Sequence, residues 1–121
     1  SVVKGHRGEE EQHAAFIAVP QRSKLRWPDG NHNKSPSGAV DVGPYIKGIG
    51  VPWASVLMLK GYSKREARAG CIAHFCQFSG VVLSFAESMG IKLRWGGNWD
   101  GDDIILIDQR FDDLPHYELR P

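Results

Sequence analysis

The sequence predicts a single domain of the α+β class spanning residues 1–121, and two features of its apolar pattern carry that prediction. Short apolar runs typical of strands are separated by long stretches of chain, and one long segment has helical periodicity instead. A chain of 121 residues and 13.4 kDa has the usual size of one domain and is long enough to form a core. The expected strands are residues 1–4, 39–42, 91–95 and 116–119.

The longest helix is expected over residues 63–89. Ser63 and Glu66 form a capping-box pattern at its start, and Gly90 follows its end. Small and apolar residues recur inside this segment at helical spacing, so we expect that face to lie against the sheet. These residues are Ile72, Phe75, Cys76, Ser79, Val82, Leu83 and Ala86.

Four other segments complete the expected structure. Residues 9–19 are predicted to form a helix, because acidic residues begin it where they suit the helix dipole and Pro20 stops it. Residues 21–37 are rich in Pro, Gly, Asn and Ser, which indicates a long loop. The apolar run 54–59 fits either a short helix or a strand. The run 104–107 is expected to be buried in either conformation.

Composition and charge narrow the possible partners. A formal net charge of +1 provides no broad basic surface, so we expect no nucleic-acid partner. No apolar run approaches the roughly 18–20 residues that span a membrane, and no signal peptide opens the chain, so we expect a soluble monomer without membrane contact. Cys71 and Cys76 lie five residues apart in the expected helix and point to different sides, which favours two buried thiols over a disulfide.

Two histidines and a carboxylate suggest a metal site. His32, Asp41 and His116 form a common ligand set for catalytic zinc, in which a fourth position is left for water. Asp113 precedes His116 by three residues and is placed to sit beside that water. Asp is depleted in strands, so Asp41 inside an expected strand also favours a ligand role. Taken alone, however, the spacing of His32 and Asp41 occurs in many proteins, and His116 also fits a hydrogen-bonded histidine at a strand end.

Four ordered motifs carry a resemblance that covers almost the whole chain. The run His-Asn-x-x-Pro-Ser-x-Ala-Val-Asp-Val-x-Pro-Tyr, from His32 to Tyr45, resembles the zinc motif of peptidoglycan peptidases related to D-Ala-D-Ala carboxypeptidases. The L-alanyl-D-glutamate endolysins of phages belong to that family. The other three motifs are Gly5-His6-Arg7 with Gln12, then Arg94-Trp95-Gly96-Gly97-Asn98-Trp99, and finally Asp113-Leu114-Pro115-His116-Tyr117-Glu118-Leu119.

The resemblance implies a site and a reaction. It implies one zinc ion on His32, Asp41 and His116, with Asp113 as the general acid/base and Arg7 facing the scissile carbonyl to stabilise the oxyanion. It also implies a small, mainly antiparallel sheet that carries the zinc site, with helices packed on one side. The expected substrate is a peptidoglycan stem peptide cut at the L-Ala-D-Glu bond, by a phage lysin acting on the host wall or an enzyme of the bacterial envelope.

Two other functions remain open at this stage. One is a D-Ala-D-Ala type carboxypeptidase on the same scaffold, and the other is a zinc-containing wall-binding module without turnover, against which Arg7 and Asp113 both count. A nucleic-acid-binding domain would use the cations Arg7, Arg22, Lys24 and Arg26, but no aromatic residues are interleaved with them.

Several positions depart from the family pattern or have two interpretations. The helical segment that usually precedes the arginine motif is missing, and residues 29–31 stand where relatives carry a serine and a lysine. Asp112 is an alternative to Asp113 as the acid/base. We choose Asp113, because its spacing from His116 matches the family pattern. Glu118 shares a strand face with His116 and could orient it or bind substrate, with Tyr117 and Leu119 packing on the other side. The cluster Asp100, Asp102 and Asp103 fits a solvated acidic turn better than a calcium loop.

Overall fold

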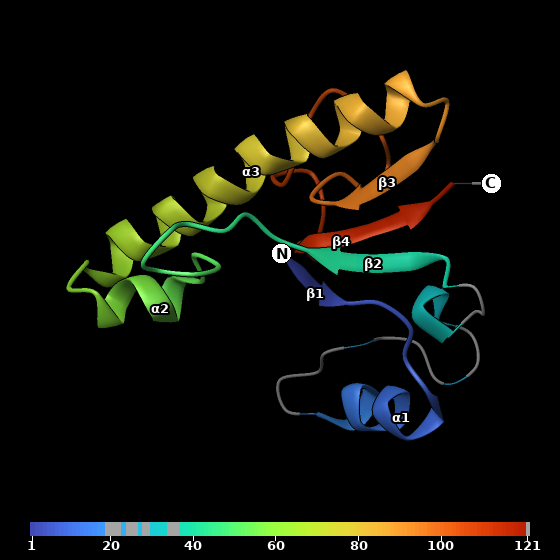
Figure 1. Cartoon of the computed structure of the whole chain (residues 1–121), viewed down its shortest axis with the longest axis horizontal. Helices are drawn as coiled ribbons and strands as arrows, with labels where there is room; N and C mark the ends of the chain where they lie inside the picture. The colour runs from blue at the N-terminus through green and yellow to red at the C-terminus, as the bar shows by residue number, and fades with distance from the viewer. Residues whose placement is uncertain (19–22, 24–26, 28–29, 34–36, 121) are drawn as a thin grey trace.

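The computed structural model describes residues 1–18, 23, 27, 30–33 and 37–120, and it contains the elements labelled in Figure 1. Pro20, Arg22, Lys24, Arg26 and Asp29, which entered the sequence interpretation, lie outside the described residues. The helices and strands are β1 (Val2–Lys4), α1 (Glu9–Ile17), the 3₁₀ turn η1 (Asn31–Asn33), β2 (Ala39–Val42), α2 (Ala54–Leu59), α3 (Lys64–Ser88), β3 (Leu93–Gly96) and β4 (Asp113–Leu119).

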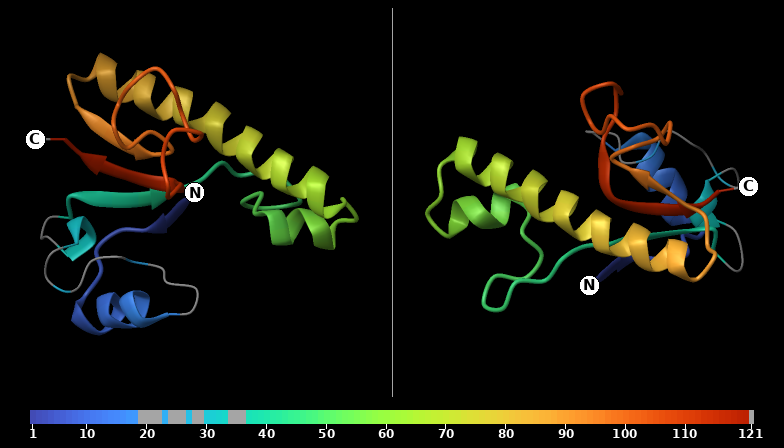
Figure 2. Two further views of the ribbon diagram at one scale, coloured as in Figure 1. Left: turned by 180° about the vertical axis from the view of Figure 1, so that it is seen from behind. Right: turned by 90° about the horizontal axis from the view of Figure 1, so that it is seen from above.

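The four strands form one antiparallel sheet in the order β1-β2-β4-β3 (Figure 1), which confirms the predicted α+β class. The central pair, β2 and β4, joins the middle of the chain to its end, and in its register Asp41 lies directly opposite His116. Helix α3 packs against β3 and β4, whereas α1 lies beyond the β1 edge of the sheet (Figures 1 and 2). The pairing of β2 with β4 therefore brings two distant motifs together.

The two faces of β4 have different roles. Side chains alternate along a strand, so His116 and Glu118 lie on one face and Tyr117 on the other. Tyr117 is buried near Cys76 of α3, and burial together with that thiol raises the pKa of the phenol. The histidine therefore projects from the face of the sheet that α3 does not cover. Leu119 was expected to pack beside Tyr117, but it is largely exposed.

Helix α3 begins as the sequence predicts and buries most of the face that was expected, since Ser79 and Ala86 are buried and Cys76, Val82 and Leu83 are partly buried. Ser63 accepts a hydrogen bond from the Glu66 amide while the Glu66 carboxylate accepts one from the Ser63 amide, so the capping box is confirmed. Phe75 is fully buried as predicted, but Ile72 is 42% exposed. The reason is that the first half of α3 packs on α2 and the second half on the sheet. A single helical stripe is therefore not buried along its whole length.

The apolar run at residues 104–107 was predicted to be buried, and this prediction is wrong. The run forms neither a helix nor a strand, and it is mostly exposed. Ile107 is 90% exposed, and Leu106 has a left-handed backbone with φ of 69°. Backbone amides in the run bond instead to the Asp102 side chain and to the Gly97 carbonyl. These local bonds fold the run into a turn. The other uncertain run, residues 54–59, is the helix α2.

Two expectations about α3 need correction. By length and composition α3 is apolar enough to cross a membrane, so the expectation that no segment reaches such a length is wrong. A core helix passes the same test, so this property alone assigns no membrane role. Cys71 and Cys76 are free thiols, as predicted, but they are half-buried rather than buried, and partial burial raises the pKa of each.

Candidate metal centre

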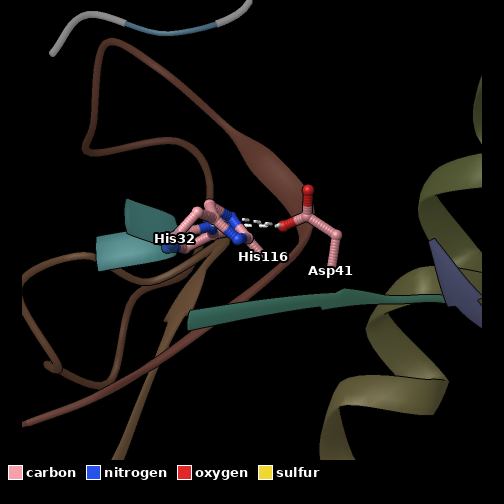
Figure 3. A group of neighbouring side chains, drawn as sticks. All are labelled: His32, Asp41 and His116. Carbon is pink, nitrogen blue, oxygen red and sulfur yellow. Dashed lines mark hydrogen bonds and ion pairs between the residues drawn. The ribbon is translucent and has the colours of Figure 1, made fainter. Parts of the chain in front are cut away.

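Three side chains from separate parts of the chain converge on one point. Asp41 and His116 are cross-strand partners, and such pairs place their Cβ atoms about 5 Å apart on the same face. His32 comes from η1, whose position is fixed by a 2.6 Å hydrogen bond from the Arg7 amide to the His32 carbonyl. Figure 3 shows the two imidazoles and the carboxylate pointing toward one another. These are the residues that the sequence predicted as metal ligands.

The distances among the three donor atoms fit a tetrahedral metal site. His32 Nε2 lies 3.2 Å from His116 Nδ1 and 3.3 Å from Asp41 Oδ1, and His116 Nδ1 lies 3.2 Å from the same oxygen. Zinc binds such atoms at about 2.0–2.1 Å, which gives tetrahedral edges of about 3.3–3.4 Å. If both imidazoles donated to Asp41 without a cation, their N–H groups would face each other. The group can therefore hold one metal ion.

Hydrogen bonds on the far side of each imidazole select the nitrogen that faces the site. His32 Nδ1 donates to the Gly5 carbonyl over 2.7 Å, and His116 Nε2 donates to Glu118 Oε1 over 2.8 Å. Glu118 also accepts a 2.7 Å hydrogen bond from Arg94. Such outer partners fix the tautomer and orientation of metal-binding histidines. They leave His32 Nε2 and His116 Nδ1 as the atoms available to a metal ion.

The surroundings of Asp41 favour its ionised form, and those of His116 favour its protonated form. Burial would raise the pKa of Asp41, but hydrogen bonds from His116 and His32 outweigh it and lower the pKa well below the usual 3.8. Burial would lower the pKa of His116, but its hydrogen bonds to Asp41 and Glu118 outweigh that effect and raise the pKa above 6.5. Protons and a metal ion therefore compete for the same nitrogen.

This competition predicts how zinc affinity depends on pH. The raised pKa keeps His116 protonated to a higher pH than a free histidine, and zinc must displace that proton. We expect the apparent affinity to be constant above this pKa and to fall about tenfold per pH unit below it, and the fall should begin at a higher pH than the 6.5 of a free histidine would give. Competition with a fluorescent chelator between about pH 5.5 and 8 checks this. An affinity that does not change across that range would contradict it.

Glu118 provides a second prediction. Replacing it with Gln keeps the shape but removes the charge that supports His116, and loss of such outer partners weakens metal binding about 10–100-fold. Chelator competition measures the change, and Glu87→Gln, on the exposed part of α3, is the matched control. Equal affinities for Glu118→Gln and the wild type would show that this carboxylate does not support the ligand.

Asp113 lies at the edge of the metal group. Its Oδ2 atom is 3.9 Å from His116 Nδ1, and its side chain remains partly exposed. Burial, followed by the charge of Asp41, raises its pKa above 3.8, which favours a group that can both take up and release a proton. Gly96 makes this position possible, because a Cβ on Gly96 would lie 2.0 Å from the Asp113 carbonyl oxygen. Gly96, the last residue of β3, thus has a local structural reason.

Arg7 is held by a network of buried amides. Its Nη1 atom donates to Gln12 Oε1 over 3.0 Å, and Gln12 is fully buried. Asn33 donates from its side chain to both Gln12 and the Arg7 carbonyl. The adjacent His6 donates to the Asn33 carbonyl, so its side chain ties the same turn to the start of the chain. Asn33 thus couples Arg7 to the turn that carries His32.

A groove of about 700 Å³ passes the metal group on its carboxylate side. Arg7, Asp41 and Asp113 all line it, together with the aromatic rings of Trp53 and Phe111. Trp99 stacks on Phe111 and lies 5.4 Å, centre to centre, from the His116 ring. The groove therefore offers cationic groups, carboxylates and apolar walls to the same ligand, since Lys4, Glu11 and Asp112 line it as well.

Sequence reasoning missed three parts of this centre. The Gly5 carbonyl accepts a hydrogen bond from His32, and the Arg94 guanidinium donates one to Glu118. Asn33 positions Arg7. Arg94 and Asn33 lie inside the recognised motifs, which was the available signal, but a backbone carbonyl leaves no trace in the sequence. A second acidic group involves Asp100, Asp102 and Asp108, not Asp103, and all three are exposed. The carboxylates of Asp100 and Asp102 accept hydrogen bonds from turn amides, as in a solvated acidic turn.

Comparison with known proteins adds no further assignment. No family model, curated protein or solved structure matches the chain. The arguments for function therefore depend on the geometry of the site and on the motifs of the sequence.

Proposed function

We propose that this protein is a zinc-dependent peptidase that hydrolyses peptidoglycan stem peptides. The observation that carries the proposal is the placement of Arg7 and Asp113 in one groove beside the group His32, Asp41 and His116. A binding module needs the three ligands only. The added guanidinium and carboxylate have the chemistry of an oxyanion partner and a general base, which favours turnover.

Each residue has a role in the proposed reaction. Zinc, when bound, supplies Lewis acidity and a water whose pKa is lowered from about 15.7 to roughly 7. Asp113 takes the proton of the attacking water and later passes it to the leaving amine. Arg7, held by Gln12, donates charge-assisted hydrogen bonds to the oxygen where negative charge develops. Glu118 keeps His116 in the orientation that presents Nδ1.

The substrate class is supported by the motifs and by the groove. The resemblance to D-Ala-D-Ala carboxypeptidase-related enzymes favours a stem peptide that contains a D-residue, and a mixed aromatic and charged groove suits a peptide with carboxylate side groups. We propose cleavage at the L-Ala-D-Glu bond. Removal of a terminal D-Ala is the second candidate.

Digestion of purified peptidoglycan tests the proposal and separates these two reactions. Zinc-loaded protein is expected to release fragments with new L-Ala carboxyl ends and D-Glu amino ends, which mass spectrometry identifies. Free D-Ala in place of these ends would assign the carboxypeptidase reaction. Retention on the wall without any released fragment, by protein shown to hold one zinc, would favour the binding module and contradict hydrolysis.

A further inference from the structure

The hairpin between α2 and α3 ends in a tip that is exposed on nearly every residue. We define the hairpin tip as residues 58–68. In Figures 1 and 2 it extends away from the sheet, at the far end of α3 from the strands. Apart from Ala67, all of its residues are exposed. These side chains are therefore not covered by the rest of the described chain.

Apolar side chains are prominent on the tip. Leu59 is 88% exposed, and Met58 and Tyr62 are each about half exposed. Leu57, the preceding residue in α2, is buried and anchors the short helix to α3. Exposed leucine and methionine at a protruding turn add nothing to the core. Clustered exposed apolar groups of this kind are typical of an interaction surface.

Basic side chains surround these apolar groups. Lys60, Lys64, Arg65 and Arg68 are four of the chain's 15 basic residues, whereas Glu66 is the tip's only one of the 14 acidic residues. The Glu66 carboxylate is already used in the capping box. In the part of the chain that the structure describes, none of the four cations forms an ion pair. A chain with a net charge of only +1 thus concentrates positive charge at this end.

Helix stability does not explain two of these cations. Lys64 and Arg65 occupy the first turn of α3, where the positive end of the helix dipole makes a cation unfavourable. Their position therefore has a small local cost. A negatively charged partner at the tip would remove this cost and would explain both residues.

We propose that the hairpin tip docks on an anionic phospholipid surface. A lipid interface satisfies both features at once, since it accepts exposed apolar side chains among its acyl chains and attracts the surrounding cations to its phosphates. A soluble anionic polymer would use the cations but leave Leu59 and Met58 in water. The contact is peripheral and differs from the expectation of no membrane contact.

The position of the tip is compatible with the groove being open during docking. The tip lies at the N-terminal end of α3, and the strands that carry the metal group begin beside the middle of that helix (Figure 1). Docking would hold the protein at the membrane while the groove remains accessible. The inference uses no feature of the metal centre, so it stands or falls independently of the proposed hydrolysis.

Vesicle flotation with the full chain tests the proposal without zinc or peptidoglycan. We expect the protein to float with vesicles of phosphatidylglycerol and phosphatidylethanolamine and to remain behind with pure phosphatidylcholine. Lys64→Gln combined with Arg65→Gln is expected to weaken binding about thirtyfold, because each cation near an anionic surface contributes about fivefold. This variant should fold normally, since it removes charges that oppose the dipole. Leu59→Ser tests the apolar part and should also weaken binding.

Matched variants at the other end of α3 provide the controls. Met89→Ser removes an apolar side chain that is 70% exposed and Lys92→Gln an exposed cation, and both should float like the wild type. The proposal is overturned if anionic vesicles fail to bind the wild type or if the tip variants float unchanged. It is also overturned if the protein binds polyphosphate as tightly as the vesicles and Leu59→Ser changes neither affinity. That result would identify an anionic polymer as the partner.

Discussion

Replacing Asp113 with Asn is expected to lower kcat for stem-peptide hydrolysis by about 10²–10⁴-fold, the range that a positioned general base contributes. The amide has nearly the same shape but cannot accept the proton of the attacking water. Because Asp113 Oδ2 lies 3.9 Å from His116 Nδ1, outside the close triangle of donor atoms, the variant should still bind one zinc. Single-turnover kinetics together with metal analysis measures the two properties separately.

The neighbouring residue is a close control for this experiment. Asp112 is exposed and accepts a hydrogen bond from Gln109, so Asp112→Asn should retain nearly all activity. The comparison also tests the choice between the two adjacent carboxylates made from the spacing of the motif. An equal loss of kcat in both variants would mean that activity depends on the structure of the turn and not on one carboxylate. Loss in Asp112→Asn alone would reverse the assignment.

Replacing His116 with Ala is expected to abolish zinc binding at micromolar metal and, with it, hydrolysis. Zinc sites with four protein ligands have apparent binding free energies of about 10–16 kcal/mol, so one ligand corresponds to roughly 3 kcal/mol, or at least about a hundredfold in affinity. A second readout is thermal. Zinc at about 100 times its Kd stabilises the native state by about 2.7 kcal/mol, and the variant should lose this zinc-dependent rise in Tm.

An exposed histidine provides the control for that variant. His13 lies on α1 with its side chain exposed, so His13→Ala should bind zinc with unchanged affinity and show the full rise in Tm. Circular dichroism of metal-free His116→Ala checks that the sheet remains, since the change also removes a partner of the buried Glu118. A folded variant that still binds one zinc with the affinity of the wild type would exclude His116 as a ligand.

The part of the site that depends on strand pairing was predictable from sequence. Asp41 lies in the short run 39–42 and His116 begins the run 116–119, so both were expected on strands before any pairing was known, and an aspartate in a strand is unusual enough to suggest a ligand. Their cross-strand contact follows once β2 and β4 pair. The capping box of α3 was equally predictable, because two residues at fixed spacing determine it.

Features that depend on tertiary packing were not predictable in the same way. The exposed turn at residues 104–107 has an apolar composition, but it is held by bonds to Asp102 and Gly97 that no local pattern indicates. Ile72 has the spacing of a core residue and is exposed because α2 takes the neighbouring face of α3. The contact of Glu118 with His116 was expected from their places on one strand face, but the pairing of Arg94 with Glu118 required the register of β3 against β4.

Titration of metal-free protein with zinc, followed by the rate of release of new amino ends from peptidoglycan, tests the central claim most directly. If His32, Asp41 and His116 hold one catalytic ion, activity should rise linearly up to one zinc per chain and then remain constant. The Asp113→Asn variant should bind the same single zinc and stay inactive. Protein that contains one zinc per chain and releases no amino ends, or activity that persists after the metal is removed, would contradict the account.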